Sequence, residues 1–135
     1  MLLGADTGYF LRYARGSQRA VQVWEELKVG LHQMVMSTLT LNELLVYFFR
    51  RGEPEEGERL VGLLQQTPEI EVVPVSAEIA TLSARYRYGL GIPTVDSVIL
   101  ATFLSTECEL ILTTDEHFRR AAEQRLIEVE ILADG

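Results

Sequence analysis

The 135-residue chain has a single cysteine, Cys108, so it cannot form a disulfide within itself. We expect Cys108 to be a buried, inert thiol in an intracellular protein. No apolar run approaches the roughly 20 residues that span a membrane, and residues 1–5 lack the basic segment that opens a secretory leader. These absences predict a cytoplasmic chain with no membrane partner.

Basic residues are also scarce. Twelve Lys and Arg stand against 20 Asp and Glu, and the net charge of −8 argues against binding nucleic acid over a broad basic surface. The N-terminal 67 residues carry seven basic and eight acidic residues, whereas the remaining 68 carry five and twelve. Any contacts with nucleic acid are therefore expected from the N-terminal half, where Arg12, Arg15 and Arg19 lie close together. Solvated helix faces are the alternative role for these three, and also for Arg50 and Arg51 at the end of a later helix.

Several phosphate-binding and metal-binding motifs are missing. The glycines around Asp6 lack the spacing of a Walker or dinucleotide-binding loop. A DxD-type phosphatase needs an aspartate at the position of Gly8, and a receiver domain needs a buried lysine, whereas Lys28 falls in a predicted surface helix. His32 and His117 stand alone in the sequence, which disfavours a zinc site.

Short apolar segments alternate with helical patterns along the chain. Strands are expected near residues 2–5, 34–36, 70–75, 109–114 and 127–131, and helices near 9–14, 18–29, 39–51, 54–66, 77–88, 94–104 and 116–123. Alternating strands and helices build right-handed βαβ units. The pattern predicts an α/β fold, a three-layer sandwich with a central, mostly parallel sheet of about five strands flanked by helices. Residues 1–135 are expected to form a single domain.

Four carboxylates stand apart from the solvated acidic runs: Asp6, Glu43, Asp96 and Asp115. Asp6 and Asp115 each follow a buried strand, at the sheet edge where sites form in parallel sheets. Glu43 and Asp96 lie in apolar helices, the latter with Thr94 as its expected N-cap. Crowded carboxylates repel one another unless a cation neutralises them, and oxygen ligands favour Mg²⁺ or Mn²⁺. We therefore predict a metal site.

Each carboxylate also has an ordinary structural role open to it. Asp6 and Asp115 are able to cap the helices that follow them, and Asp96 is able to complement a helix dipole. Glu43 is able to pair with Arg50, seven residues further along the same helix, or to face solvent.

The four carboxylates fall in four segments that together span nearly the whole chain: Asp6–Gly8, Leu39–Leu44, Ile92–Ala101 and Leu112–Phe118. In content and order these segments resemble the PIN-domain family, and within it the small VapC-type toxins of toxin-antitoxin pairs.

The resemblance implies a metal-dependent ribonuclease with Asp6, Glu43, Asp96 and Asp115 as catalytic residues. It implies Asp6, Asp96 and Asp115 as ligands of Mg²⁺ or Mn²⁺. Two positions depart from the family pattern: Gly8 stands where serine is common, and His117 stands where a further aspartate is frequent. Thr7 and Thr113 are expected to support the site in place of the missing hydroxyl.

The leading functional hypothesis is an Mg²⁺-dependent endoribonuclease that is the toxin of a VapBC-type pair. Its alternatives are a PIN-like protein-binding module whose site has decayed and a Mg²⁺-dependent small-molecule phosphatase. RNA, a second copy of the chain and an antitoxin are the expected partners. The helix from Leu39 to Arg51 suggests an interface, because it is apolar around most of its circumference.

Overall fold

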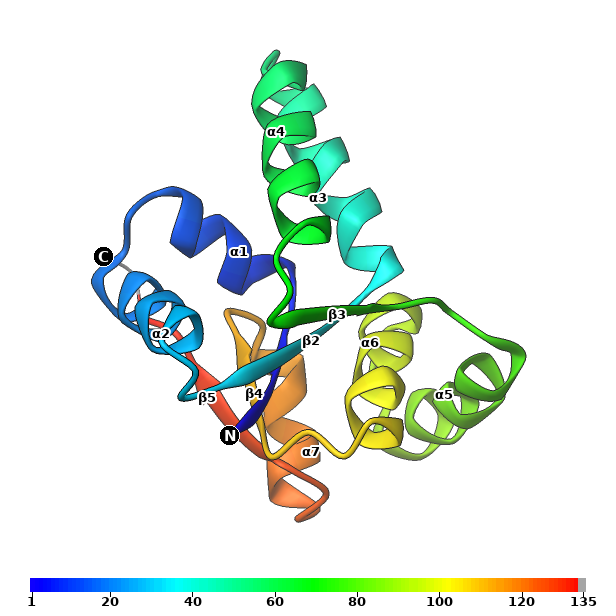
Figure 1. The fold of residues 1–135 in the computed structure, drawn as a ribbon. Coiled ribbons are helices and arrows are strands. Elements are labelled where there is room, and N and C mark those ends of the chain that lie inside the picture. Colours follow the sequence, from blue (N-terminus) through cyan, green and yellow to red (C-terminus); the bar gives the residue numbers. More distant parts are fainter. Residues whose placement is uncertain (134–135) are drawn as a thin grey trace.

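The computed structural model describes residues 1–133 (Figure 1). Its strands are β1 (Leu2–Ala5), β2 (Gln33–Ser37), β3 (Ile70–Val73), β4 (Leu110–Thr113) and β5 (Glu128–Ile131). Within the described residues they form one five-stranded sheet in the order β3-β2-β1-β4-β5, and every neighbouring pair is parallel. The predicted α/β sandwich is confirmed, with a sheet that is parallel throughout.

The helices also follow the predicted order. They are α1 (Thr7–Ala14), α2 (Gln18–Lys28), α3 (Thr38–Arg50), α4 (Pro54–Gln65), α5 (Ala77–Leu90), α6 (Thr94–Ser105) and α7 (Arg119–Glu123), with a 3-10 turn, η1 (Glu116–Phe118), before α7. One predicted cap is wrong. Pro93 occupies the N-cap position of α6 and Thr94 is the first helical residue, because the Ser97 backbone N–H donates to the Pro93 carbonyl at 2.8 Å.

The helices cover both faces of the sheet, since alternate strand residues point to opposite sides. On one face, Leu3 and Met36 pack with buried side chains of α1 to α4. On the other face, Val35 and Ile111 pack with side chains of α6 and α7, and α5 lies outside α6 (Figure 1). Asp6 and Asp115 follow the carboxyl ends of β1 and β4, and Glu43 and Asp96 lie within α3 and α6.

A glycine sets how closely α6 approaches the central strand. A Cβ atom on Gly4 would lie 2.6 Å from the Cδ1 atom of Phe103, whose ring is fully buried. Only glycine leaves room for that ring against the backbone of β1.

The α3 helix is partly covered by its own chain. Leu44 is fully buried, and α4 comes so close that a Cβ on Gly57 would lie 2.8 Å from the Cβ of Phe48. Figure 1 shows α3 and α4 running side by side away from the sheet. Phe49 remains 51% exposed near the end of α3. The sequence therefore overstated how much apolar surface α3 leaves to a partner, although Phe49 stays available.

Cys108 is free and buried, and burial raises the pKa of its thiol, as expected of an inert core cysteine. Among residues 1–133, no single helix is long and apolar enough to cross a membrane. The pair α5 and α6 has sufficient length and composition only when taken together, and the two are bent by 118°.

Candidate active site

Asp6 ends the central strand and begins the first helix. Its Oδ1 accepts the Tyr9 backbone N–H at 3.2 Å, which caps α1, and its Oδ2 accepts the Thr113 hydroxyl. The side chain is nevertheless buried, with 5% of the residue exposed. Burial raises the pKa of Asp6 to about 7, and the negative charges of Asp115 and Glu43 raise it further against the two hydrogen bonds. Asp6 is a helix cap held in an electrostatically unfavourable place.

Thr113 links the ends of the two neighbouring strands β1 and β4. Its hydroxyl donates to Asp6, and the same oxygen accepts the Asp115 backbone N–H at 2.9 Å. Asp115 caps η1 by accepting the His117 backbone N–H at 2.9 Å. Because β1 and β4 are adjacent and parallel, their following residues meet at the same edge of the sheet.

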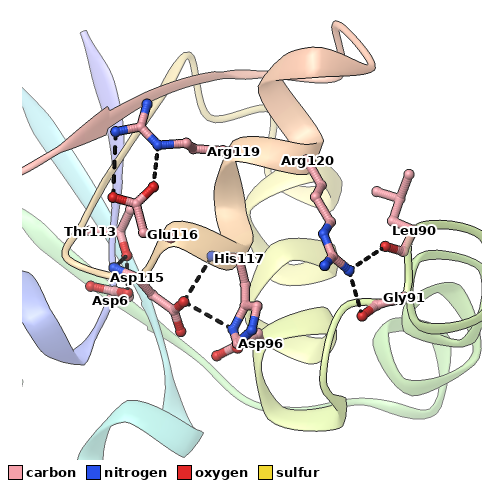
Figure 2. A network of polar contacts seen from close by, with 10 residues as sticks. All are labelled: Asp6, Leu90, Gly91, Asp96, Thr113, Asp115, Glu116, His117, Arg119 and Arg120. Atoms are coloured by element: carbon pink, nitrogen blue, oxygen red, sulfur yellow. Dashed lines mark hydrogen bonds and ion pairs between the residues drawn. The ribbon is translucent and has the colours of Figure 1, made fainter.

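Asp96 and His117 complete a compact group with Asp115 (Figure 2). Nδ1 of His117 lies 3.1 Å from Oδ2 of Asp96 and 3.0 Å from Oδ1 of Asp115. One ligand atom of each residue falls within 4.8 Å of the others, which is a spacing that fits a bound metal ion. Burial, followed by the charge of Asp115, raises the pKa of Asp96 to about 6, and His117 opposes that shift.

Glu43 approaches the site from α3. Its Oε1 accepts the hydroxyl of Thr7, the residue after Asp6, at 2.6 Å. Within residues 1–133 Glu43 forms no ion pair with Arg50, and its hydrogen bond joins α3 to the residue that follows Asp6. The four carboxylates predicted from the sequence therefore come from four separate segments and gather at one end of the sheet. Asp6 and Glu43 lie beside the Asp96, Asp115 and His117 group without being part of it.

The sequence matches the family model of the PIN domain over residues 5–124. The chain belongs to the PIN-domain family. No curated protein matches this PIN domain.

Solved structures share the fold at low sequence identity. VapBC2 from Rickettsia felis, bound to a DNA fragment from its promoter, is 15% identical with a TM-score of 0.77, covering 97% of this chain and 98% of the other. VapBC-1 from nontypeable Haemophilus influenzae is 19% identical with a TM-score of 0.72, covering 97% and 98%. A toxin-antitoxin complex from Klebsiella pneumoniae is 19% identical with a TM-score of 0.69, covering 93% and 94%. At these identities the likeness shows the fold.

The two departures from the family pattern acquire structural meaning in this PIN domain. His117 has no other histidine or cysteine near it in the sequence that would complete a zinc set, yet it bridges two of the carboxylates, Asp96 and Asp115. Its position two residues after Asp115 is the signal that the sequence offers. At Gly8, a Cβ atom would lie 2.0 Å from Oγ1 of Thr114, so the threonine hydroxyl already occupies the space of a side chain there.

A side chain of α7 holds the turn that precedes α6. One nitrogen of Arg120, Nη1, donates to the carbonyl oxygens of Leu90 and Gly91, each at 2.8 Å (Figure 2). Gly91 has a φ of 65° and ends α5 in the left-handed conformation that glycine adopts freely. Because α6 starts three residues later, this contact helps to position Asp96.

The three arginines expected to bind RNA have different surroundings. Arg19 forms a two-bond ion pair with Glu130 of β5, at 2.8 and 2.9 Å. Arg15 donates a hydrogen bond to the hydroxyl of Tyr47 at 3.3 Å, so its guanidinium group lies against α3. Arg12 lies in the last turn of α1 and lines a small cavity with Arg19 and Leu132. The contact of Arg15 lies on the α3 side, where Glu43 also lies.

Proposed function

We propose that this PIN domain is a metal-dependent endoribonuclease in which Asp6, Glu43, Asp96 and Asp115 are the catalytic residues. The observation that carries the proposal is the gathering of these carboxylates at the carboxyl edge of a parallel sheet, where the pKa values of Asp6 and Asp96 are raised. Such crowding costs stability unless a cation relieves it. Membership of a nuclease family supports the same chemistry.

Carboxylate oxygens suit Mg²⁺ or Mn²⁺. Asp96 and Asp115 offer such oxygens beside the His117 imidazole, and Asp6, which interacts with Asp115, is proposed as the third carboxylate ligand. An ion held there would lower the pKa of a water molecule, so that hydroxide would be available to attack a phosphodiester, and would stabilise the negative charge that develops on the phosphate oxygens. The chain itself supplies orientation. Thr113 holds the Asp6 carboxyl and the Asp115 backbone, and Thr7 holds Glu43, so each hydroxyl supports a proposed catalytic group.

We further propose that residues 1–135 form a single cytoplasmic domain that is the toxin of a VapBC-type pair, with RNA as substrate and with a homodimer and an antitoxin as its assemblies. The fold shared with VapBC complexes supports this reading. The test uses the protein encoded by a short reading frame next to this gene. Once purified, that protein should form a complex with this chain and suppress cleavage of RNA. A protein that does neither would contradict the toxin assignment.

Single-stranded RNA, with and without Mg²⁺, tests the activity. Asp6→Asn, Asp96→Asn and Asp115→Asn should each reduce cleavage by about 100-fold or more, because each removes a carboxylate proposed to hold the ion, and loss of even an outer partner of a metal ligand costs about 10- to 100-fold. Glu78→Gln, an exposed acid on α5, is the matched control. EDTA should stop cleavage by the wild-type chain. Cleavage that is equal in all four variants would refute the site.

The two alternative functions give different results in the same experiment. A decayed binding module would neither cleave RNA nor respond to a metal titration. A small-molecule phosphatase would release phosphate from a nucleotide monophosphate and leave single-stranded RNA intact.

A further inference from the structure

A cavity of about 630 Å³ adjoins the proposed catalytic residues between α1, α3 and the start of α6. At one end it is lined by Thr7 and Glu43, which share the 2.6 Å hydrogen bond, and by Val95, the residue before Asp96. At the other end it is lined by Arg50 and Arg51. The cavity therefore leads from the acidic site to the basic end of α3.

The wall between these ends is apolar and aromatic. Leu11 of α1 and Val46 and Tyr47 of α3 line it. Seven residues separate Glu43 from Arg50, which at 1.5 Å per helical residue is about 10 Å along α3. An occupant that reaches from the acids to the arginines must therefore be extended, with an apolar or flat middle part.

Two guanidinium groups contact Tyr47, and a third arginine, Arg50, lines the same cavity, in a chain whose net charge is −8. Arg15 donates to the Tyr47 hydroxyl at 3.3 Å, and the guanidinium carbon of Arg51 lies 5.5 Å from the centre of the Tyr47 ring. Arg50 is exposed at the end of α3 and has no hydrogen bond or ion pair within residues 1–133. An aromatic wall with cations beside it is the arrangement that binds single-stranded nucleic acid, with bases on the wall and phosphates on the cations.

We infer that this cavity binds the nucleotides of single-stranded RNA that adjoin the cleaved phosphate. The apolar wall of Leu11, Val46 and Tyr47 takes a base, and Arg15 and Arg50 bind phosphates on the side away from the acids. The inference rests on the proposed ribonuclease function and locates its substrate-binding cations. It favours Arg15 over Arg19, whose guanidinium is already paired with Glu130.

The experiment measures the affinity of the full chain for a fluorescein-labelled single-stranded RNA by anisotropy. Ca²⁺ replaces Mg²⁺ so that the carboxylates are neutralised, and a gel run afterwards verifies that the RNA is intact. Arg15→Gln and Arg50→Gln are compared with Arg59→Gln on α4, which removes the same charge from an arginine whose side chain is 69% exposed and which pairs with Glu56.

Arg15→Gln and Arg50→Gln should each weaken binding about tenfold at low salt, as loss of a charge-assisted phosphate contact does. Each should also reduce the slope of log affinity against log salt by about 0.7, the value for one phosphate contact on a single strand. Arg59→Gln should change neither quantity. Tyr47→Phe, which keeps the ring and removes the hydroxyl that Arg15 contacts, should resemble Arg15→Gln more weakly.

The inference would be overturned if the wild-type chain cleaves RNA and the three variants, Arg15→Gln, Arg50→Gln and Arg59→Gln, have the same affinity and the same salt slope. The ribonuclease function would still stand. Unchanged RNA binding in variants that no longer bind the antitoxin would also overturn it, since the cavity would then be a protein-binding site. A wild-type chain that neither binds nor cleaves RNA would overturn both.

Discussion

Replacing Asp6 by asparagine should stabilise the metal-free protein above neutral pH. The pKa of Asp6 is raised to about 7 in the folded chain, chiefly by burial, from 3.8. As the pH rises, the unfolded chain releases this proton first, so the folded state binds more protons between about pH 4 and pH 7. Stability therefore falls across that range, is highest from this source below the unfolded pKa, and levels off above about pH 7.

The magnitude follows from the size of the shift. At 1.36 kcal/mol for each pKa unit, an ionised Asp6 destabilises the fold by about 4 kcal/mol above pH 7. Asparagine is neutral at every pH and removes this loss. It also takes the acceptor away from the Thr113 hydroxyl, whose oxygen already accepts the Asp115 N–H, at a cost of about 1 kcal/mol. Asp6→Asn should thus be about 3 kcal/mol more stable than wild type at pH 8.

Urea unfolding in EDTA, followed by the fluorescence of Trp24, is the assay. Trp24 is the only tryptophan and stacks on Tyr13 at 4.3 Å between ring centres, so it reports tertiary packing. At pH 4 the order should reverse, with Asp6→Asn about 1 kcal/mol less stable, because wild-type Asp6 is then protonated. Asp96, with its own raised pKa of about 6, is present in both chains and cancels. A variant that is less stable than wild type at both pH values would refute the reasoning.

Three further outcomes are expected. A divalent ion at 100 times its dissociation constant should stabilise wild type by about 2.7 kcal/mol, and an equal gain in Asp115→Asn, measured by thermal unfolding, would contradict the metal site. Gly8→Ala should destabilise by about 1–3 kcal/mol because its Cβ would lie 2.0 Å from Oγ1 of Thr114; Thr114→Ala should recover part of this loss in the double variant, and additive effects would rule out the clash. Sedimentation at micromolar concentration should show a dimer that Phe49→Glu weakens, whereas a monomeric wild type would remove the homodimer.

Much of the fold followed from the sequence because its signals are local. Each strand is a short apolar run, and five such runs separated by helical segments admit few topologies under the right-handed crossover rule. The positions of Asp6 and Asp115 could be predicted for the same reason: each directly follows a strand, and parallel strands deliver their carboxyl ends to one edge.

What the sequence could not supply depends on contacts between distant segments. His117 joins the site only because η1 turns its side chain toward Asp96, 21 residues away. Arg19 meets Glu130 across 111 residues, which no local pattern indicates. The predicted Thr94 cap was wrong by one residue, since the carbonyl of Pro93 already accepts the first helical hydrogen bond.

The contact between Gly4 and Phe103 helps to set the distance between Asp6 and Asp96, although neither Gly4 nor Phe103 belongs to the site. Asp6 lies two residues beyond Gly4, about 7 Å along the strand, and Asp96 lies seven residues before Phe103, about 10 Å along α6. Both carboxylates are thus positioned by one contact, in which the Phe103 ring packs on the backbone of Gly4. A Cβ atom on Gly4 would lie 2.6 Å from that ring. A side chain at position 4 would push α6 outward and widen the gap between Asp6 and Asp96 while both proposed ligands stayed in the sequence. Under the proposed function, Gly4→Ala should therefore weaken the affinity for the divalent ion although it changes no proposed ligand.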